Sequence, residues 1–548
     1  MTAVAPAGPR ADRPAGAARS SAVVGTRHLL RASLRQDGRL LAPWAVIVTA
    51  LSVSSVIVYP FVFPDERARA GLAAAVGANP AIGLIFGPAH DLSTADGFNA
   101  WRCLAIGGFL TALGAIFAVT RATRAQEDSG QAELLASGVM GRSTRLLTGV
   151  AMALVGSVLV GVLAGVVTVL CGGGATASFL LAATFTATGW MFAGVAAVTA
   201  QVGSDARTAS SMAVGVLGVL FGLVGFCYSL DAPRWTIWAN PLGWMHETQP
   251  ASGDRWAPLA LAVALTVALV AVAFRLQSRR DFGQGTVAPR PGPARGTARS
   301  TWRLALRVNR GPFVTWTVAF VALGFVFGYF ATSVTDIFGS DPGIGDALAG
   351  GATTPRDLTS GFLVMILSLA GILASVSGVQ VMLKVRAEEL EDRVEPVLAG
   401  AVARPRYWAS NVVVALAFPT IFLTIAGTLV AVLVAGADLG LGFGDAFTQS
   451  LATIPAAWTV VAVSVAVVGA RPVVSIAAWA GVLVSFVLTL LGPTFGLDDW
   501  VLGISPFWHL PHVAATSPDW TGLGWITLVA LGLLVVGFAG FRRRDLAR

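Results

Sequence analysis

The chain has 548 residues, of which 55% are hydrophobic and only 12% charged, and its formal net charge is +8. Soluble domains carry about twice this density of charged residues, so the composition excludes a set of ordinary water-soluble domains and indicates a membrane protein. The positive excess is compatible with an acidic partner such as nucleic acid, or with the arginines and lysines that flank membrane helices on their cytoplasmic side. The positions of the charges along the chain distinguish these two interpretations.

Lys384 is the only lysine of the chain, and it lies in an apolar run. A nucleotide-binding P-loop needs a lysine directly after a glycine-rich loop, so this chain is not expected to hydrolyse ATP by that route. The three cysteines and five histidines have no metal-binding spacing. The sequence therefore predicts no catalytic residue, no metal site and no cofactor in this chain.

The predicted elements begin with a tail. Residues 1–26, rich in Ala, Pro, Gly and Arg, are predicted to be a disordered basic cytoplasmic tail, and residues 27–41 to be an amphipathic helix on the inner membrane surface. Twelve apolar stretches follow, and most are long enough to cross about 30 Å of hydrocarbon at ~1.5 Å per residue. They lie near 41–62, 102–120, 147–171, 176–200, 209–230, 257–274, 313–331, 360–383, 408–436, 446–469, 472–492 and 521–541.

Residues 275–299, rich in Pro, Gly and Arg, are predicted to be a cytoplasmic linker between two six-span domains, 27–274 and 300–548. The two domains are expected to be an internal repeat, because five groups of residues recur in the same order. The groups pair Leu34-Arg35 and Trp44 with Leu306-Arg307 and Trp316, Arg124 to Arg142 with Arg386 to Arg404, Arg207 with Arg471, Trp235 and Pro241 with Trp500 and Pro506, and Phe274-Arg275 with Phe541-Arg542. Six spans return the chain to its starting side, so the repeat is expected to be parallel, with a pseudo-twofold axis along the membrane normal.

The loops on the two sides of the predicted spans differ in charge. If both termini and the linker are cytoplasmic, that side holds 31 basic and 13 acidic residues, a balance of +18, and the outer side holds 6 basic and 16 acidic residues, a balance of −10. Basic residues concentrate on the cytoplasmic side of membrane helices. The sequence therefore predicts a multi-pass plasma-membrane protein with cytoplasmic termini, and the net charge needs no nucleic-acid partner.

No Asp, Glu, Lys, Arg or His lies in the middle of any predicted span. Carriers driven by protons or sodium ions usually need such residues near the midplane, so the pattern disfavours an ion-coupled carrier. The energy for any transport is then expected to come from outside the membrane.

Two cytoplasmic loops, one after the second span of each half, are the candidates for receiving that energy. Each combines a charged beginning with a short amphipathic segment that ends at a glycine, Gly138 in the first half and Gly400 in the second. Such a segment can dock in a groove of a partner through its apolar side while its acids meet basic residues. The alternative is a solvated interface loop, but the recurrence of the spacing in both halves favours docking.

These motifs together resemble the permease of ABC-2-type exporters, which is a six-span unit with R-x-x-E and E-L-L-x-S-G between spans two and three, an outer hairpin between spans five and six, and a closing F-x-R-R-D. Two fused copies behind a basic tail look like the actinobacterial antibiotic exporters of the tetronasin or polyketide type. The similarity covers almost the whole chain, although its motifs are short. The second copy departs from the first at Pro396, which stands where the first has Leu134, so two docking contacts are not expected to be equivalent.

The resemblance implies that the loop after span two is a coupling helix that contacts a separate ATPase subunit. It assigns this role to Glu127, Glu133, Leu134, Gly138 and Arg142 in the first half, and to Glu389, Glu395, Gly400 and Arg404 in the second.

The segments between the fifth and sixth spans place tryptophans around an Asn-Pro or Ser-Pro turn. The resemblance implies re-entrant helices that form an outer gate, with Trp235 and Pro241 in the first half and Trp500 and Pro506 in the second. The aromatic belt at the membrane interface explains the same tryptophans equally well.

The resemblance also implies that spans two and five line the translocation path, where Phe221 and Phe486 could face each other; simple packing of a glycine-rich helix is the alternative. A path without charges suits hydrophobic or amphiphilic cargo. The closing Arg543-Arg544-Asp545 is expected to be only a charge anchor at the membrane surface.

Together with the resemblance, the sequence predicts the non-catalytic permease subunit of an ATP-driven exporter of antibiotics or drugs. Its expected partners are two copies of a separate ATPase, which bind ATP and Mg, together with a hydrophobic small molecule and the lipid bilayer. Two alternatives stay open. One is a twelve-span secondary carrier, and the other is a membrane transferase for lipid-linked substrates, with Asp498-Asp499 and His509 with His512 as its clustered candidates.

Overall fold

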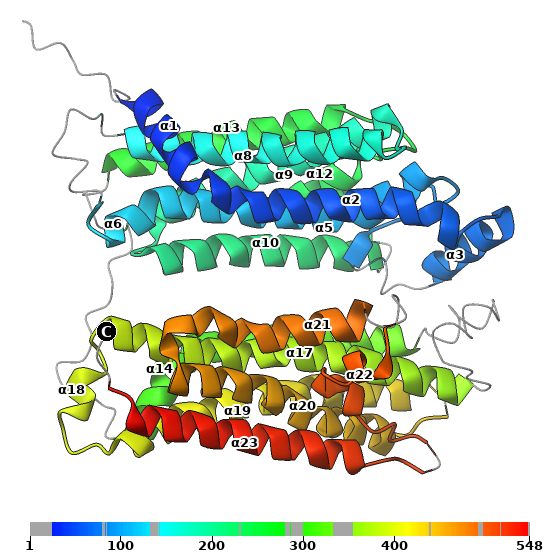
Figure 1. Cartoon of the computed structure of the whole chain (residues 1–548). Helices are drawn as coiled ribbons and strands as arrows, with labels where there is room; N and C mark the ends of the chain where they lie inside the picture. The colour runs from blue at the N-terminus through cyan, green and yellow to red at the C-terminus, as the bar shows by residue number, and fades with distance from the viewer. Residues whose placement is uncertain are drawn as a thin grey trace, which may run out of the picture. The chain divides into compact units, whose positions relative to one another are not determined.

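The computed structural model divides the chain into two compact units, Met1–Pro291 and Gly292–Arg548 (Figure 1). The described residues are 25–78, 83, 85–131, 141, 143–229, 232–279, 285, 300–332, 355–437, 440–491, 497–515 and 517–545. Most of the predicted tail and most of the predicted linker lie outside these ranges.

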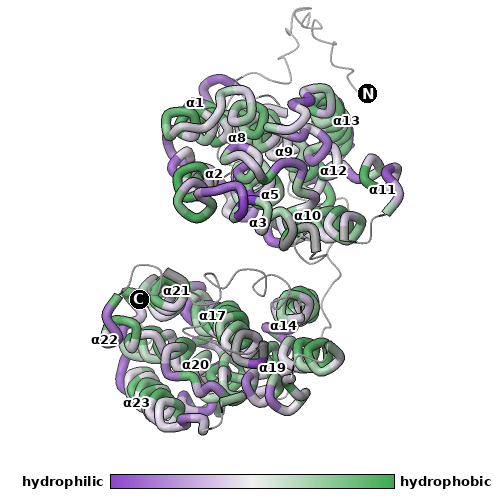
Figure 2. The backbone as a smooth tube through the Cα atoms, turned by 90° about the vertical axis from the view of Figure 1, so that its right-hand side faces the viewer, coloured by the Kyte–Doolittle hydropathy of each residue, from purple (hydrophilic) through white to green (hydrophobic). Residues whose placement is uncertain are grey.

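The described residues form helices and contain no strand. Eleven of these helices are long and apolar enough to cross a membrane, and Ala477–Thr489 is a shorter apolar helix. The prediction of an all-α polytopic membrane protein with about twelve spans is therefore confirmed. Figure 2 looks along the helices of each unit and shows hydrophobic residues throughout the spans, with hydrophilic residues gathered in connecting segments such as α3 (Glu66–Ala78).

The first unit contains six long helical spans. Its helices are α1 (Thr26–Asp37), η1 (Gly38–Leu41), α2 (Ala42–Val62), α3, α5 (Ala95–Thr120), η2 (Arg121–Ala125), α6 (Gln126–Asp128), α8 (Thr144–Leu170), α9 (Ala175–Val202), α10 (Ala206–Ser229), α11 (Arg234–Ala239), α12 (Pro241–His246) and α13 (Ala257–Arg279). The fourth span, α9, packs against α5, α8, α10 and α13 and carries the buried aromatic residues Phe185 and Phe192. It is therefore the centre of this unit.

The second unit has the same order of spans. Its helices are α14 (Thr301–Thr332), α17 (Pro355–Leu390), α18 (Glu395–Leu398), α19 (Arg404–Ala435), α20 (Phe443–Ala470), η3 (Pro472–Trp479), α21 (Ala480–Leu491), α22 (Asp499–Leu502), η4 (Pro506–His509) and α23 (Thr521–Arg543). Its fourth span, α20, packs against α17, α19, α21 and α23. The neighbours of the fourth span are thus the same in both units, as expected for a duplicated fold.

Close packing of the third and fourth spans also recurs. A Cβ added to Gly189 of α9 would overlap the hydroxyl of Ser157 on α8, and a Cβ added to Gly427 of α19 would overlap the hydroxyl of Ser450 on α20. Glycine at these positions lets two helix backbones approach closely, which favours association of helices in a membrane. A glycine thus meets a serine between the third and fourth spans of both units, with the glycine on the fourth span in the first unit and on the third span in the second.

The fifth spans differ. In the first unit α10 is continuous, whereas the predicted span 472–492 is divided into η3 and α21, with a non-helical backbone at Val474. Pro472 stands at the first position of this segment, where the missing N–H group costs no helical hydrogen bond, so the proline does not account for the break. The fifth span of the second unit therefore begins with a local break that the hydropathy pattern does not indicate.

The only lysine has a structural role in α14. Pro312 lies inside this helix and has no N–H group to donate to the carbonyl of Val308, one turn earlier. The Nζ atom of Lys384 on α17 donates to that carbonyl at 2.6 Å. The lysine thus satisfies an acceptor that the proline leaves without its helical partner, and it joins the first and second spans of the second unit.

We expect Lys384→Met to lower the free energy of unfolding by about 1–3 kcal/mol, because the carbonyl of Val308 then loses a charged donor. Thermal unfolding of the purified protein in detergent measures the change. Lys384→Arg keeps a donor and is the matched control. Equal stability of Lys384→Met and the unmodified protein would show that this hydrogen bond is unimportant.

Candidate functional site

The candidate site consists of the two loops that follow the second spans, called loop A (residues 121–143) and loop B (residues 386–404). Glu133, Leu134, Gly138 and Arg142 of loop A lie outside the described residues. Loop B is described throughout and contains α18.

Both loops contain a helix end at an equivalent position. Gly130, with φ 74°, terminates the helical segment in loop A, and its N–H donates to the carbonyl of Glu127 at 3.1 Å. Asp392, with φ 55°, terminates α17 in loop B, and its N–H donates to the carbonyl of Glu389 at 3.1 Å. A left-handed residue after the last turn is a common helix stop, and aspartate adopts this conformation more readily than most residues. The chain therefore turns away from the second span at the same point in each half.

A buried ion-pair network precedes the turn in loop A. Glu127 accepts from Arg124 at 2.9 Å and from Arg145, at the beginning of α8, at 3.2 Å. The Arg124 side chain is completely buried, and its Nε donates to the carbonyl of Ala200 near the end of α9. The last carbonyls of a helix lack intrahelical partners and carry partial negative charge, which suits a guanidinium. This network joins the second, third and fourth spans of the first unit.

An analogous network precedes the turn in loop B. Glu389 accepts from Arg386 at 3.1 Å and from Arg544, which directly follows α23, at 2.6 Å. The Nε atom of Arg544 donates to the carbonyl of Gly469 at 3.0 Å, near the end of α20. Here the arginine at the end of the fourth span comes from the sixth span instead of the second. The network therefore joins the second, fourth and sixth spans of the second unit.

Aromatic packing holds Arg544 in place. Its guanidinium carbon lies 5.0 Å from the ring centre of Phe541, and that ring stacks on Trp408 with centroids 4.3 Å apart. Phe541 and Trp408 are both buried. The expectation that Arg543-Arg544-Asp545 is only a charge anchor is wrong for Arg544, because this residue closes a buried network. Sequence reasoning also missed Arg145. The signal for Arg544 was its position three residues after Phe541, directly after the end of the last apolar span.

Glu127 and Glu389, which recur at equivalent positions in the two halves, are buried instead of presented at the surface. The side chain of Glu127 is 5% exposed and that of Glu389 is 1% exposed. In this structure they hold the loops to the spans, so any part they play in contact with a partner is indirect. Glu395, Gly400 and Arg404, in contrast, are exposed.

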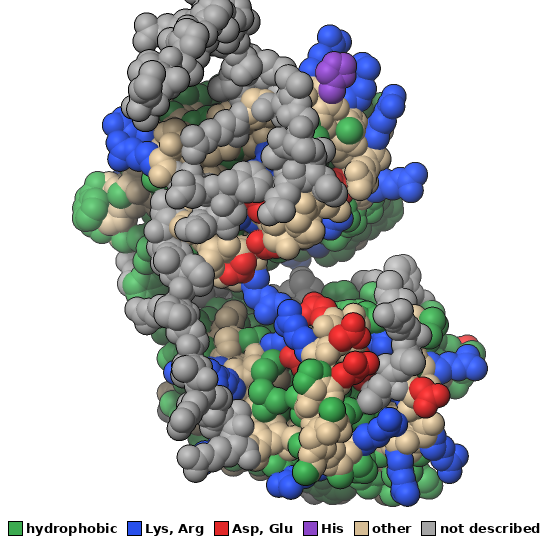
Figure 3. All heavy atoms as spheres, turned by 90° about the vertical axis from the view of Figure 1, so that its left-hand side faces the viewer, with side chains coloured by type: hydrophobic (Ala, Val, Ile, Leu, Met, Phe, Trp, Pro, Cys, Tyr) green, Lys and Arg blue, Asp and Glu red, His purple; other side chains and the backbone are tan. Residues whose placement is uncertain are grey.

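The short helix α18 presents a polar face. Val394 is buried, and Val397 and Leu398 pack against the core of their own unit. The apolar side of this amphipathic segment is therefore already covered. The exposed side carries Glu395 and Pro396, and Glu391 and Asp392 add acidic charge before it; Figure 3 shows acidic side chains gathered with arginines on this end of the second unit.

The segments after the fifth spans form pairs of short helices in both units. Asn240 precedes Pro241 and accepts from the N–H of Leu242 at 3.0 Å, and Ser505 precedes Pro506 and accepts from the N–H of Phe507 at 3.4 Å. A polar cap followed by proline is a strong helix start, which explains the Asn-Pro and Ser-Pro pairs.

The two tryptophans in these segments are exposed to a similar extent. Trp235 at the beginning of α11 is 71% exposed, and Trp500 in α22 is 73% exposed. An exposed tryptophan is expected both in an outer gate and in an aromatic belt at the membrane interface, so the role of Trp235 and Trp500 stays a prediction.

The hairpin of the first unit contains a buried histidine. His246 packs edge-on against Tyr228 with ring centroids 5.2 Å apart, and a Cβ on Gly87, which has φ 76°, would lie 2.6 Å from its Cε1. Burial lowers the pKa of His246 to about 4, and His90 acts in the same direction. The neutral imidazole is thus a packed part of the hairpin.

This histidine predicts a pH dependence of stability. The pKa of His246 is below its ordinary value of 6.5 in the folded chain, so its stabilising effect is complete above about pH 6.5 and is lost as the pH falls toward 4. We expect the free energy of unfolding to fall by about 2 kcal/mol between pH 7 and pH 5. Thermal unfolding at several pH values measures this, and His246→Gln is expected to remove most of the dependence. An unchanged dependence in that variant would contradict the assignment.

The predicted path residues lie in the fifth spans. Phe221 on α10 packs edge-on against Phe109 on α5, with ring centroids 5.1 Å apart. The second and fifth spans of the first unit therefore contact each other at this pair. Phe486 on α21 is 41% exposed, and its predicted contact with Phe221 stays a prediction.

The clustered candidates for transferase chemistry have structural contacts. The His509 ring interacts with the carbonyl of Gly503 at 2.8 Å, and Asp499 belongs to the first turn of α22. Over the described part of the chain, no three His, Cys, Asp or Glu residues are grouped as a metal site requires.

The fold and these elements define a class, namely polytopic helical membrane proteins with two similarly packed six-span units. Within that class, the chain belongs to the Rv1217c-like family of multidrug efflux system permeases. The family model described as Multidrug efflux system permease Rv1217c, C-terminal domain, matches residues 68–276 and 299–542, one range in each half. The Multidrug efflux system permease protein Rv1217c of Mycobacterium tuberculosis (strain ATCC 25618 / H37Rv) is 34% identical over 563 aligned positions that cover 98% of each chain.

Proposed function

We propose that this chain is the membrane permease of an ATP-driven exporter of ABC-2 type, similar to the fused tetronasin-type exporters, and that it moves hydrophobic or amphiphilic drugs out of the cell. The observation that carries the proposal is the pair of equivalent loops after the second spans, each tied to its own bundle by a buried glutamate. The name of the relative, a multidrug efflux system permease, supports the same class of cargo.

The proposed mechanism uses two copies of a separate ATPase subunit, which hold ATP and Mg. Their closure on ATP would push on loops A and B from the cytoplasm. Since Glu127 is bonded to Arg145 at the beginning of α8, a push on loop A would reach the third span; since Glu389 is bonded to Arg544, a push on loop B would reach the sixth. Short ion pairs inside a packed bundle transmit a displacement as a rigid unit.

The exposed acids of loop B are the proposed contact surface for the ATPase. Glu395 lies in the first turn of α18, and Gly400 and Arg404 follow on the same exposed stretch. In loop A, the same role is proposed for Glu133, Leu134, Gly138 and Arg142. The buried Glu127 and Glu389 are proposed as positioning residues that fix the loops against the spans.

Reconstitution of the chain with a cognate ATPase subunit tests this function. We expect a stable complex with two ATPase subunits per chain, and ATP-dependent transport of an amphiphilic dye in proteoliposomes that an uncoupler does not abolish. Absence of a complex, or transport that needs a proton gradient and no ATP, would contradict the proposal and favour a secondary carrier.

A further inference from the structure

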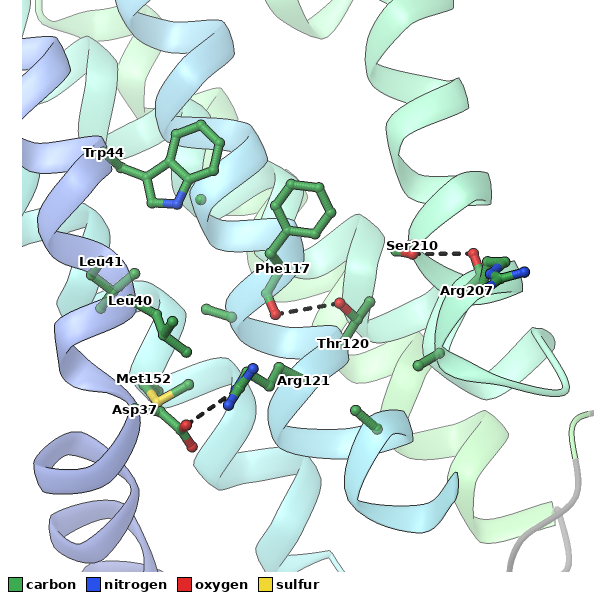
Figure 4. Close-up of a pocket in the computed structure, with 14 residues that line it drawn as sticks. Asp37, Leu40, Leu41, Trp44, Phe117, Thr120, Arg121, Met152, Arg207 and Ser210 are labelled. Atoms are coloured by element: carbon green, nitrogen blue, oxygen red, sulfur yellow. Dashed lines mark hydrogen bonds and ion pairs between the residues drawn. The ribbon is translucent and has the colours of Figure 1, made fainter. Parts of the chain in front are cut away.

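A cavity of about 480 Å³ lies in the first unit where the segment from α1 to α2 passes α5 and α10 (Figure 4). One part of its wall is apolar and consists of Leu40, Leu41, Trp44, Phe117 and Met152. The rings of Trp44 and Phe117 are stacked with centroids 6.2 Å apart, and 44% of Phe117 is exposed. The cavity thus offers aromatic and aliphatic surface to a hydrocarbon or ring system.

The other part of the wall is charged. The Nε atom of Arg121, directly after α5, donates to Oδ1 of Asp37 at 3.1 Å, and Figure 4 shows the two side chains pointing toward each other. The Arg121 side chain is 58% exposed, whereas that of Asp37 is 12% exposed. The contact with Asp37 occupies one donor of a guanidinium that has five, so the exposed edge of Arg121 can donate to another acidic group.

Positive charge prevails among the residues that line the cavity. Arg121 and Arg207 line it together with a single carboxylate, Asp37. Two further carboxylates lie near Arg121 and Arg207 in the sequence but bind backbone N–H groups at the beginning of α10. Asp128 accepts from the N–H of Ala206 at 2.7 Å, and Asp205 accepts from the N–H of Thr208 at 2.8 Å. The only carboxylate among the lining residues is already paired with Arg121, so a cationic ligand would find no unpaired acid there, whereas an acidic ligand would gain Arg121 as a partner.

We propose that this cavity binds an amphiphile with an acidic group, whose apolar body lies against Trp44 and Phe117 and whose acid pairs with Arg121. A mainly apolar wall with few convergent polar groups is typical of small-molecule sites. Guanidinium groups recognise carboxylates and phosphates through paired hydrogen bonds, so Asp37 holds the arginine in place and competes with the ligand for it. The ligand comes from one of two sources, an acidic phospholipid or an acidic cargo, and only the cargo source rests on the proposed function.

A binding experiment with the full-length chain in phosphatidylcholine nanodiscs tests the site without ATP or ATPase. The probe is 11-(dansylamino)undecanoic acid, whose emission rises in an apolar site, and the comparison is its uncharged primary amide. We expect the acid to bind about tenfold more tightly than the amide, which is the effect of one charge-assisted pair. Equal affinities of acid and amide would overturn the proposal.

Four variants locate the site. Arg121→Gln is expected to lower the affinity for the acid to that for the amide, and Asp37→Asn to raise the affinity for the acid because a competing carboxylate is removed. Phe117→Ala is expected to weaken both ligands equally. Arg275→Gln changes an exposed arginine on α13 and is the matched control. Unchanged binding of the acid by Arg121→Gln, or weaker binding by Asp37→Asn, would overturn the assignment; size-exclusion profiles show that each variant is folded.

The source of the ligand is decided by repeating the titration in nanodiscs with phosphatidylglycerol. If an acidic phospholipid fills the cavity, the apparent affinity of the unmodified chain for the acid falls severalfold, and that of Arg121→Gln does not. If the affinity stays the same, the cavity selects an acidic cargo over lipid. Complex formation with the ATPase is measured separately. Absence of that complex would therefore not affect the binding result, and absence of binding in the cavity would not contradict the proposed function.

Discussion

Replacement of Glu389 by glutamine is expected to lower the free energy of unfolding by about 3 kcal/mol and, on the proposed function, to reduce export about tenfold or more. Glu389 is buried between Arg386 and Arg544, so the neutral side chain leaves two guanidiniums without their carboxylate in a poorly solvated place. Removal of one partner from a buried charge network is far more costly than loss of a surface pair.

The matched control for Glu389→Gln is Glu395→Gln in the same loop. Glu395 is exposed and makes no ion pair within the described residues, so its replacement is expected to leave stability within about 0.5 kcal/mol. If loop B contacts the ATPase, Glu395→Gln lowers the stimulation of ATPase activity without lowering the unfolding temperature. Thermal unfolding and ATPase assays on the same preparations separate the two effects. Normal export by a folded Glu389→Gln variant would refute the positioning role.

The second large effect is expected at Arg544. Its replacement by glutamine removes the ion pair to Glu389, the hydrogen bond to the carbonyl of Gly469 and the contact with Phe541. We expect a loss of about 3 kcal/mol, because Glu389 and the end of α20 lose the same charged partner. The sixth span should then separate more easily from the fourth, and loop B should be cleaved faster in limited proteolysis.

Arg543→Gln is the control for this prediction, since Arg543 is the preceding residue and is exposed. Its replacement is expected to change neither the unfolding temperature nor the rate of proteolysis. The counterpart in the first unit is Arg145→Gln. This change removes one arginine from Glu127 but leaves Arg124 bonded to both Glu127 and the carbonyl of Ala200, so a smaller loss is expected than for Arg544→Gln, which also frees the carbonyl of Gly469. Equal behaviour of Arg543→Gln and Arg544→Gln would show that the C-terminal arginines are only surface charge.

Much of the fold could be predicted from the sequence because its determinants are local. Each span is an uninterrupted apolar stretch that matches the thickness of a bilayer, and the α8 and α9 helices extend over the stretches predicted near 147–171 and 176–200. The break at Val474 was missed, because hydropathy is insensitive to backbone geometry. The α17 helix also continues to Leu390, beyond the predicted end at 383, because its polar last turns are stabilised by the network at Glu389.

The candidate site was predictable in part. The recurrence of R-x-x-E marked Glu127 and Glu389 as important, and the structure gives both the same place at the end of a second span. The amphipathic segment of loop B was expected to offer its apolar side to a partner, but Val397 and Leu398 are covered by their own unit. Periodicity identifies an apolar side without identifying what covers it, since that depends on residues distant in the chain.

The sequence by itself determined the class of this protein, the number and order of its spans and the existence of two matching loops, since bilayer thickness and residue spacing act over short stretches of chain. Only the tertiary structure decided which arginine meets which glutamate. Glu127 is joined to the third span and Glu389 to the sixth, through partners 18 and 155 residues away. A charge buried in a bundle takes the partner that packing brings within hydrogen-bonding distance, and that proximity is not encoded in any local pattern.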